Sequence, residues 1–262
     1  MITIKEYIRP KSLEEAYELN QKRNNRIIGG MLWIKMQRTP VNVAIDLGAL
    51  GLDTIEETSE EFSIGAMVTL RQLEQHEGLN SYSDNAIKTA VQDIIGVQFR
   101  NMATIGGSIW GRFGFSDILT VFLAMDTYVE LYKGGVISLR EFSGMKYDND
   151  ILVRIIVKKK PCKVIYDAMR IQRTDYPVIT CALSCIDGSY RAVIGARPGK
   201  AVVVEDTGIL SEGITEDSAE AFASYVASNV RTSTNMRGSA AYRKHLIKGL
   251  TARNIMRIGG QI

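Results

Sequence analysis

The first third of the chain combines apolar stretches with the two-residue period of strands and one stretch with helical spacing. Apolar residues at positions 2, 4 and 7 and within residues 41–47 predict strands, and residues 26–28, Arg-Ile-Ile, predict a short buried strand. Between the first two strands, Ser12 and Glu15 form a capping box that opens a helix to about residue 22. This β-α-β-β order predicts a small parallel or mixed sheet.

The middle of the chain predicts a larger mixed sheet accompanied by helices. Strands are expected at residues 62–66, 128–139, 151–159 and 164–171. Residues 133–136, Lys-Gly-Gly-Val, are typical of a two-residue hairpin turn between alternating strands. Helical spacing begins at Thr69, spans residues 84–95 and returns at residues 116–125.

The composition shifts near residue 170, where strands joined by tight turns are followed by two amphipathic segments. The expected strands are residues 178–186, 190–195 and 201–204, and the expected helices are residues 216–230 and 239–256. We therefore predict an α+β protein of two domains, residues 1–171 and 172–262. The second domain is predicted to be smaller, with an antiparallel sheet and packed helices.

Residues 97–117 contain four glycines among residues too apolar for an ordinary solvent loop. The centre of this segment, residues 104–108, has the sequence Thr-Ile-Gly-Gly-Ser. Adjacent glycines allow positive φ and leave backbone N–H groups unshielded, and the flanking hydroxyls add donors. Such a turn can hold an anion, most often phosphate. A tight turn that needs glycine for steric reasons alone is the other interpretation, since short Gly motifs are weak evidence.

A second Gly-Gly pair, Gly29 and Gly30, follows the apolar run at residues 26–28. Residues 31–38 then have helical spacing and stop before Pro40. Two such turns in one small domain suggest two phosphates held together, as in the pyrophosphate of a dinucleotide. Neither turn is the Rossmann fingerprint, because the sequence contains no Gly-x-Gly-x-x-Gly.

Composition and charge are those of an ordinary globular protein, with 45% hydrophobic and 23% charged residues. The net charge of +3 is too small to indicate a nucleic-acid partner. We expect a cytoplasmic protein without a membrane span, because the sequence has neither a signal-peptide pattern nor a long apolar run. The three cysteines lack Cys-x-x-Cys spacing, so no iron–sulfur or zinc ligation is expected within this chain.

Two other patterns are weaker. Residues 195–201 are similar to a phosphate-binding P-loop, but the segment is one residue short and Ala201 replaces the Ser or Thr that would hold Mg²⁺. A hairpin turn is the favoured interpretation there. With His76 and His245 as the only histidines, a His-based catalytic triad or metal site has little support.

The motif at residues 100–109, followed by Ser116-Asp117 and by residues 123–126, resembles the FAD-binding subunit of molybdenum hydroxylases, the family of xanthine dehydrogenase and carbon monoxide dehydrogenase medium subunits. The resemblance continues through residues 175–178 and 242–246 and so covers essentially the whole chain. It implies that residues 1–171 form a two-lobed FAD-binding domain. FAD would lie extended between the lobes, with its pyrophosphate on the two Gly-Gly turns.

The resemblance implies a set of cofactor-binding residues, and we identify no catalytic residue and no metal ligand in this chain. Backbone amides of the two Gly-Gly segments would be the main phosphate donors, Asp117 would bond to the ribityl or diphosphate region, and two apolar residues would line the flavin or adenine. The implied residues are Arg26, Ile27, Ile28, Gly29, Gly30, Met31, Leu32, Trp33, Thr104, Ile105, Gly106, Gly107, Ser108 and Asp117, with Ile94 and Leu152 as the two apolar residues.

The resemblance also implies electron transfer within a heteromeric complex. A molybdopterin-binding subunit would oxidise the substrate, a [2Fe–2S] subunit would relay the electrons, and the FAD of this chain would pass them to NAD or another acceptor. The molybdenum cofactor and the iron–sulfur clusters are expected only on those partner chains. We expect docking through the loops at residues 110–115, where apolar residues surround Gly111 and Gly114.

Three departures from the family pattern leave an alternative open. Met31 and Leu32 replace Thr followed by Asp or Glu, Ser108 replaces Asn, and Asp167 falls where many relatives have Lys near the flavin pyrimidine. A carboxylate at that place would oppose an anionic reduced flavin. The alternative is a non-catalytic scaffold of the same fold with weak or lost FAD binding.

Overall fold

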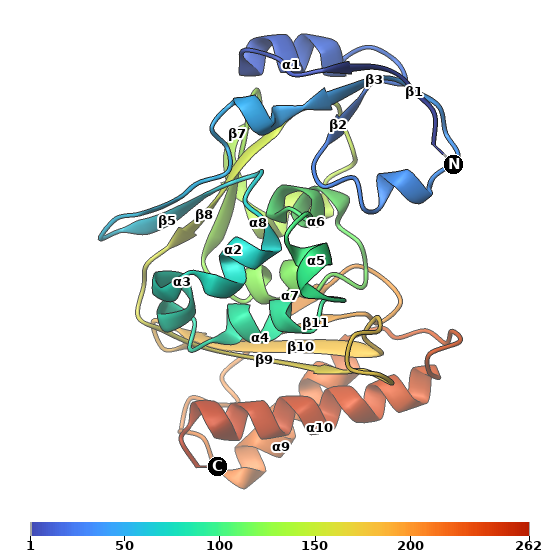
Figure 1. The fold of residues 1–262 in the computed structure, drawn as a ribbon. Coiled ribbons are helices and arrows are strands. Elements are labelled where there is room, and N and C mark those ends of the chain that lie inside the picture. Colours follow the sequence, from blue (N-terminus) through green and yellow to red (C-terminus); the bar gives the residue numbers. More distant parts are fainter. Residues whose placement is uncertain (1, 262) are drawn as a thin grey trace. The chain divides into compact units, whose positions relative to one another are not determined.

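The structure, a computed structural model that describes residues 2–261, divides into two compact units (Figure 1). The first unit comprises residues 2–72, 97–111 and 127–158, and the second comprises residues 73–96, 112–126 and 159–261. The chain passes between them several times, so neither unit is one continuous stretch of sequence. The division after residue 171 therefore stays a prediction, and each unit is described by itself.

The first unit contains the small parallel sheet that the N-terminal pattern predicts. Strand β3 (Val41–Asp46) lies between β1 (Ile4–Ile8) and β2 (Arg26–Ile28), and both pairings are parallel. Helix α1 (Leu13–Asn20) begins after Ser12, whose hydroxyl accepts a hydrogen bond from the Glu15 N–H at 3.1 Å. Strand β2 ends at Ile28, directly before the first Gly-Gly pair.

The helix predicted for residues 31–38 is wrong in extent, because only one 3₁₀ turn, η1 (Ile34–Met36), forms there. Met31 has a φ of 58°, in the left-handed region, so a right-handed helix cannot begin at this residue. Residues 29–33 are instead an irregular loop that follows β2.

The second sheet of the first unit has the order β4 (Ile55–Glu57), β5 (Glu61–Gly65), β8 (Leu152–Lys158), β6 (Thr127–Leu131) and β7 (Gly135–Ser138). We expected a mixed sheet, but every one of these pairings is antiparallel. Short hairpins join β4 to β5 and β6 to β7, whereas parallel neighbours would need long crossovers. The β6–β7 turn holds three residues rather than the predicted two. The short elements of this unit are η2 (Leu47–Ala49), α5 (Val97–Arg100), α6 (Ile105–Gly111) and α8 (Leu139–Gly144).

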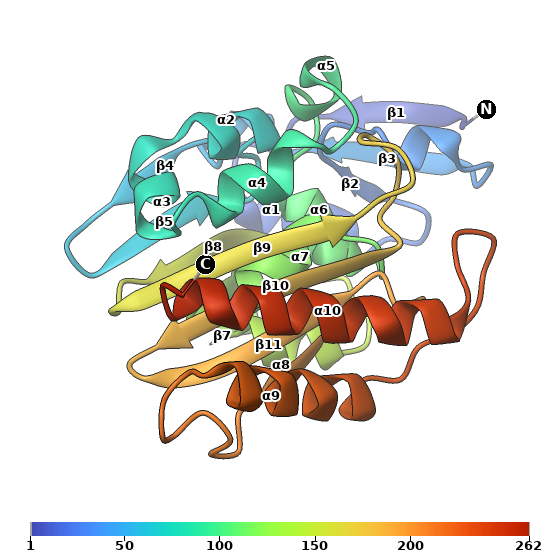
Figure 2. The same cartoon turned by 90° about the horizontal axis from the view of Figure 1, so that it is seen from below.

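The second unit is built on an antiparallel sheet of β12 (Val202–Glu205), β11 (Ser189–Gly195), β10 (Ile179–Ile186) and β9 (Cys162–Met169). Helices α9 (Glu216–Asn229) and α10 (Ala240–Ile258) cover one face, and α4 (Ala86–Gln92) and α7 (Asp117–Leu123) pack on the other (Figures 1 and 2). Helix α3 (Glu77–Tyr82) precedes α4, and the chain passes from the first unit to the second within α2 (Leu70–Gln75). The predicted α+β class is confirmed.

Candidate functional site

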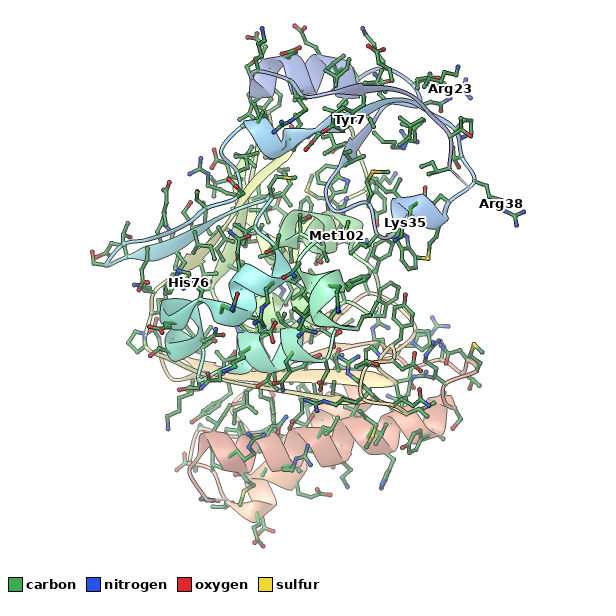
Figure 3. The ribbon with its side chains drawn as sticks, viewed as in Figure 1. Tyr7, Arg23, Lys35, Arg38, His76 and Met102 are labelled. Atoms are coloured by element: carbon green, nitrogen blue, oxygen red, sulfur yellow. The ribbon has the colours of Figure 1, made fainter. Side chains whose placement is uncertain are left out.

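The two Gly-Gly segments lie in direct contact within the first unit. A Cβ added to Gly29 would lie 2.6 Å from Oγ1 of Thr104, and one added to Gly30 would overlap the backbone oxygen of Met102 and lie 3.1 Å from the backbone nitrogen of Ala103. Met102, labelled in Figure 3, marks the place where the loop after β2 meets the segment before α6. Only glycine permits this approach, so the two segments can lie directly against each other.

Glycine is needed at these positions because the two backbones approach closely, not because φ is positive. The expectation that the Gly-Gly pairs adopt positive φ is therefore wrong. Gly29, Gly30, Gly106 and Gly107 all have ordinary φ values. A Cβ at Gly106 would lie 2.8 Å from the Cβ of Ala66, so this glycine also fits α6 against its neighbours. Gly106 and Gly107 lie in the first turn of α6 rather than in a free turn.

The loop after β2 carries backbone donors that the protein leaves unused. Among residues 2–261, nothing accepts a hydrogen bond from the backbone N–H of Gly30, Met31 or Leu32. Three adjacent amides without protein acceptors in a half-buried loop are suited to an anion. The loop is therefore the part of the site that can donate to a phosphate through its backbone.

The second segment uses its backbone donors differently, which corrects the expectation that its amides are main phosphate donors. Ile105 and Gly106 donate to backbone oxygens of residues 68 and 66, both at 2.9 Å. Gly107 donates to Oγ1 of Thr104 at 3.1 Å, and Ser108 donates to the backbone oxygen of the same threonine at 3.2 Å. Gly107 is exposed and has only Thr104 near its Cβ position, so it offers a surface bare of side chains.

The other predicted residues of the first motif surround this loop. Ile28 is buried in β2, Ile27 is half-buried, and exposed Arg26 donates to the backbone oxygen of Asn25 at 2.8 Å. The Trp33 side chain is 39% exposed at the far end of the loop. Two exposed cations, Lys35 and Arg38, lie on the same β2–β3 connection (Figure 3).

Asp117 lies in the second unit, where it is the first residue of α7 and is buried. Its Oδ1 accepts hydrogen bonds from the Tyr166 hydroxyl and from Nη2 of Arg170, the latter at 2.6 Å. Burial raises the pKa of Asp117 to about 6, while the Arg170 guanidinium opposes that rise. Asp117 is thus a buried, paired carboxylate that belongs to an ion pair as well as to the predicted site.

Because its pKa is raised in the folded protein, Asp117 is expected to contribute more to the free energy of unfolding as the pH falls. Below pH 6 the folded protein takes up a proton that the unfolded chain takes up only near pH 4, so acidification from pH 7 stabilises the fold at this residue. Asp117→Asn removes this pH-dependent contribution, because asparagine does not titrate. We expect the free energy of unfolding of the wild type, relative to this variant, to rise by about 2 kcal/mol between pH 7 and pH 4.5 in urea titrations. A difference that stays constant or falls would contradict the assignment.

The remaining predicted residues lie in different places. Leu152 is buried on β8 in the first unit, whereas Ile94 is half-buried after α4 in the second. Asp167, on β9, forms ion pairs with Arg253 at 3.0 Å and Arg257 at 3.2 Å, both from α10. Two guanidinium groups therefore offset the carboxylate that the sequence marks as a departure.

Sequence reasoning missed residues that shape the site through their backbones. The carbonyl of Met102 contacts Gly30, and those of Ala66 and Val68 hold the start of α6. No residue type is required for such contacts, so no sequence signal exists for them. Arg170 and Tyr166, the partners of Asp117, were also missed, although a charged residue at the end of an apolar strand is a weak signal for a buried ion pair.

No three His, Cys, Asp or Glu side chains within residues 2–261 are grouped so that they could hold a metal ion. No helix in that range has the length and apolar character that crossing a membrane requires.

Comparison with known proteins gives a match across most of the chain. The family described as FAD binding domain in molybdopterin dehydrogenase matches residues 2–159. The chain is 26% identical to the uncharacterized protein YgfM of Escherichia coli, over 95% of this chain and 94% of that one. It is 25% identical to the glyceraldehyde dehydrogenase medium chain of Sulfolobus acidocaldarius, over 94% of this chain and 95% of that one.

The fold is shared with a solved structure of a molybdenum enzyme. A chain of the Cu,Mo-CO dehydrogenase in its cyanide-inactivated form superposes with a TM-score of 0.86 and 19% identity, and the match covers 100% of both chains. These matches confirm the predicted family, the predicted fold and FAD as the cofactor of the domain.

Proposed function

We propose that this chain, which belongs to the family of FAD-binding domains in molybdopterin dehydrogenases, is the electron-transfer subunit of a molybdenum hydroxylase. It would receive electrons from [2Fe–2S] clusters of a partner and deliver them to NAD or another acceptor. The observation that carries the proposal is the contact between the two Gly-Gly segments. One segment has three unused backbone donors, and the other has a surface without side chains.

The residues present fit a diphosphate. The N–H groups of Gly30, Met31 and Leu32 would donate to it, and a phosphate could approach Gly107 without meeting a side chain. These donors belong to the backbone, so they persist although Met31 and Leu32 replace the polar residues of the family pattern. When bound, FAD supplies the redox chemistry, and the protein positions it and tunes its potential.

Residues outside the two loops would complete the site. We assign Asp117 to the ribityl or diphosphate region, held in place by Arg170, and Ile94 and Leu152 to apolar contacts with the flavin or adenine. The ion pairs of Asp167 reduce the repulsion that its carboxylate would exert on an anionic reduced flavin.

The partners are inferred from the medium chains that this protein is similar to. A medium chain is one of several in its enzyme, and the similarity covers nearly the whole of this chain. We infer that a [2Fe–2S] subunit and a molybdopterin-binding subunit assemble with it in the cytoplasm. The scaffold alternative is not favoured, because the family model of FAD-binding domains matches residues 2–159 and the N–H groups of Gly30, Met31 and Leu32 remain available to an anion.

The purified chain is expected to bind FAD more tightly than FMN, because only FAD carries a diphosphate for the paired segments to share. Titrating the flavin-free protein with each cofactor and following flavin fluorescence should show a preference of about tenfold or more, ~1.4 kcal/mol. Equal or tighter FMN binding would contradict the pairing of the two segments. A protein that takes up neither flavin would restore the scaffold alternative.

A further inference from the structure

The connection between β11 and β12, residues 196–201, is held in one shape by its own arginine. Arg197 donates through Nε to the backbone oxygen of Lys200 at 2.7 Å and through Nη1 to the backbone oxygen of Arg231 at 2.8 Å. Its own backbone oxygen accepts a hydrogen bond from the Ser233 N–H at 3.1 Å. These bonds lie within the second unit and fix the loop against the chain that follows α9.

The loop keeps backbone donors that the protein does not use. Within residues 2–261, nothing accepts a hydrogen bond from the backbone N–H of Arg197 or Gly199, and both residues are half-buried. A Cβ added to Gly199 would lie 3.4 Å from Cζ of Arg197, so the loop curls closely around the guanidinium group. Ala196 has a φ of 55°, a left-handed conformation that is strained for a residue with a Cβ. Unused amides in such a fixed turn are suited to an anion.

Two guanidinium groups at this loop lack a carboxylate partner. Among residues 2–261, neither Arg197 nor Arg231 forms an ion pair. Burial lowers the pKa of Arg197, and the nearby Arg231 charge lowers it further. The exposed Lys200 adds a third cation to the same loop. Like charges this close together raise the free energy of the folded protein, and an anion bound to both arginines would offset that repulsion.

The sequence similarity of this segment to a P-loop needs a different interpretation in the structure. The loop joins the antiparallel strands β11 and β12, as the hairpin interpretation predicts, and it does not lead into a helix. Its available donors are guanidinium groups and two amides, without the hydroxyl that would hold Mg²⁺. Such donors bind phosphate oxygens directly.

We propose that the side chains of Arg197 and Arg231 and the backbone N–H groups of Arg197 and Gly199, here called the Arg197 site, bind a phosphate group. Nη2 of Arg197 and the guanidinium group of Arg231 donate to no acceptor among residues 2–261. The ligand is free phosphate or a small phosphorylated molecule. It is distinct from the FAD diphosphate, whose proposed backbone donors lie in the first unit. The inference goes beyond the proposed function and does not depend on it.

The test measures phosphate binding to the FAD-loaded protein by phosphorus nuclear magnetic resonance. The titration is made in about 0.15 M chloride, which screens weak surface attraction. We expect saturable binding of one phosphate per chain. Arg231→Gln should weaken it at least about tenfold, with FAD content and melting temperature unchanged, and Arg197→Gln should weaken it at least as much. Arg23→Gln, the matched control in the first unit, removes an exposed arginine and should bind phosphate as the wild type does (Figure 3).

The outcomes distinguish this site from the FAD site. Equal phosphate affinity of the wild type and Arg231→Gln would overturn the inference, and so would a wild type that binds no phosphate in this buffer. Phosphate that binds the flavin-free protein and is displaced by FAD would belong to the FAD site, which would overturn the inference and leave the proposed function standing. A wild type that takes up no flavin, yet binds phosphate through Arg231, would overturn the proposed function alone.

A second titration, with adenosine monophosphate, identifies the source of the phosphate. If the site takes free phosphate, adenosine monophosphate should bind no more tightly than phosphate does. If it takes a phosphorylated nucleotide, adenosine monophosphate should bind at least about tenfold more tightly. Arg231→Gln should weaken the tighter of the two ligands in either case, and a variant that binds it as the wild type does would overturn the Arg197 site.

Discussion

Gly107→Val is expected to remove FAD from the protein while leaving the fold intact. Gly107 is exposed on the first turn of α6, and its Cβ position has only Oγ1 of Thr104 near it, at 3.2 Å. A valine side chain would fill the open space that we propose a phosphate occupies. We expect FAD affinity to fall by about two orders of magnitude, ~2.7 kcal/mol. The free energy of unfolding should change by less than about 1 kcal/mol, because valine is the better helix former.

The same substitution in open space provides the control. Gly144, at the end of α8 in the same unit, is exposed and has no atom within 4 Å of its Cβ position. Gly144→Val should keep its FAD, as judged by the visible absorbance of the purified protein and by titration of the flavin-free form. Normal FAD content in Gly107→Val would show that this surface does not receive the phosphate, and the role of the second motif would have to be abandoned.

Most elements of the fold could be predicted because each depends on a local pattern. The alternation at residues 41–47 and the capping box at Ser12 were enough for β3 and α1. The strands and helices after residue 178 follow equally plain periods. The failed helix at residues 31–38 shows the limit, since helical spacing says nothing about the left-handed backbone of Met31. That conformation places the loop against residues 102–104, a contact made elsewhere in the sequence.

The pairing of the two Gly-Gly segments was predictable from the sequence, whereas the use of their backbone donors was not. Two apolar segments ending in Gly-Gly suggested one shared ligand, and the structure brings Gly29 and Gly30 against residues 102–104. The sequence does not show which backbone amides remain free, because every residue has a backbone carbonyl and only the fold decides which carbonyls accept. The amides of Ile105 and Gly106 donate to Val68 and Ala66, which follow β5, and those of Gly107 and Ser108 donate to Thr104. Of the two segments, only the first loop therefore keeps unused donors.

The charges around Asp117 and Asp167 could not be read from spacing. Arg170 is 53 residues from Asp117 in sequence, and Arg253 is 86 residues from Asp167. Asp167 lies on β9, which packs against α10, and Arg170 directly follows β9. Such long-range pairing decides whether a carboxylate is an isolated charge or half of an ion pair. The departure at Asp167 therefore has a different meaning in the fold than in the sequence.

Gly30→Ala is expected to damage both the site and the fold. The added Cβ would overlap the backbone oxygen of Met102, which cannot rotate away as a side chain can. The loop after β2 would have to separate from residues 102–104, and the free amides would lose their place beside this segment. We expect no measurable FAD in the purified variant and a fall of about 3 kcal/mol in the free energy of unfolding of the flavin-free protein.

Gly29→Ala is the matched comparison for Gly30→Ala, because its Cβ would lie 2.6 Å from the Thr104 hydroxyl oxygen rather than against a backbone atom. Rotation of that hydroxyl relieves the overlap at the cost of its bond from the Gly107 N–H, about 1 kcal/mol. Urea unfolding of both flavin-free variants should therefore rank Gly30→Ala well below Gly29→Ala. If Gly30→Ala unfolded like the wild type and kept its FAD, the two Gly-Gly segments would not be held in contact, and a single shared diphosphate site could not be built from them.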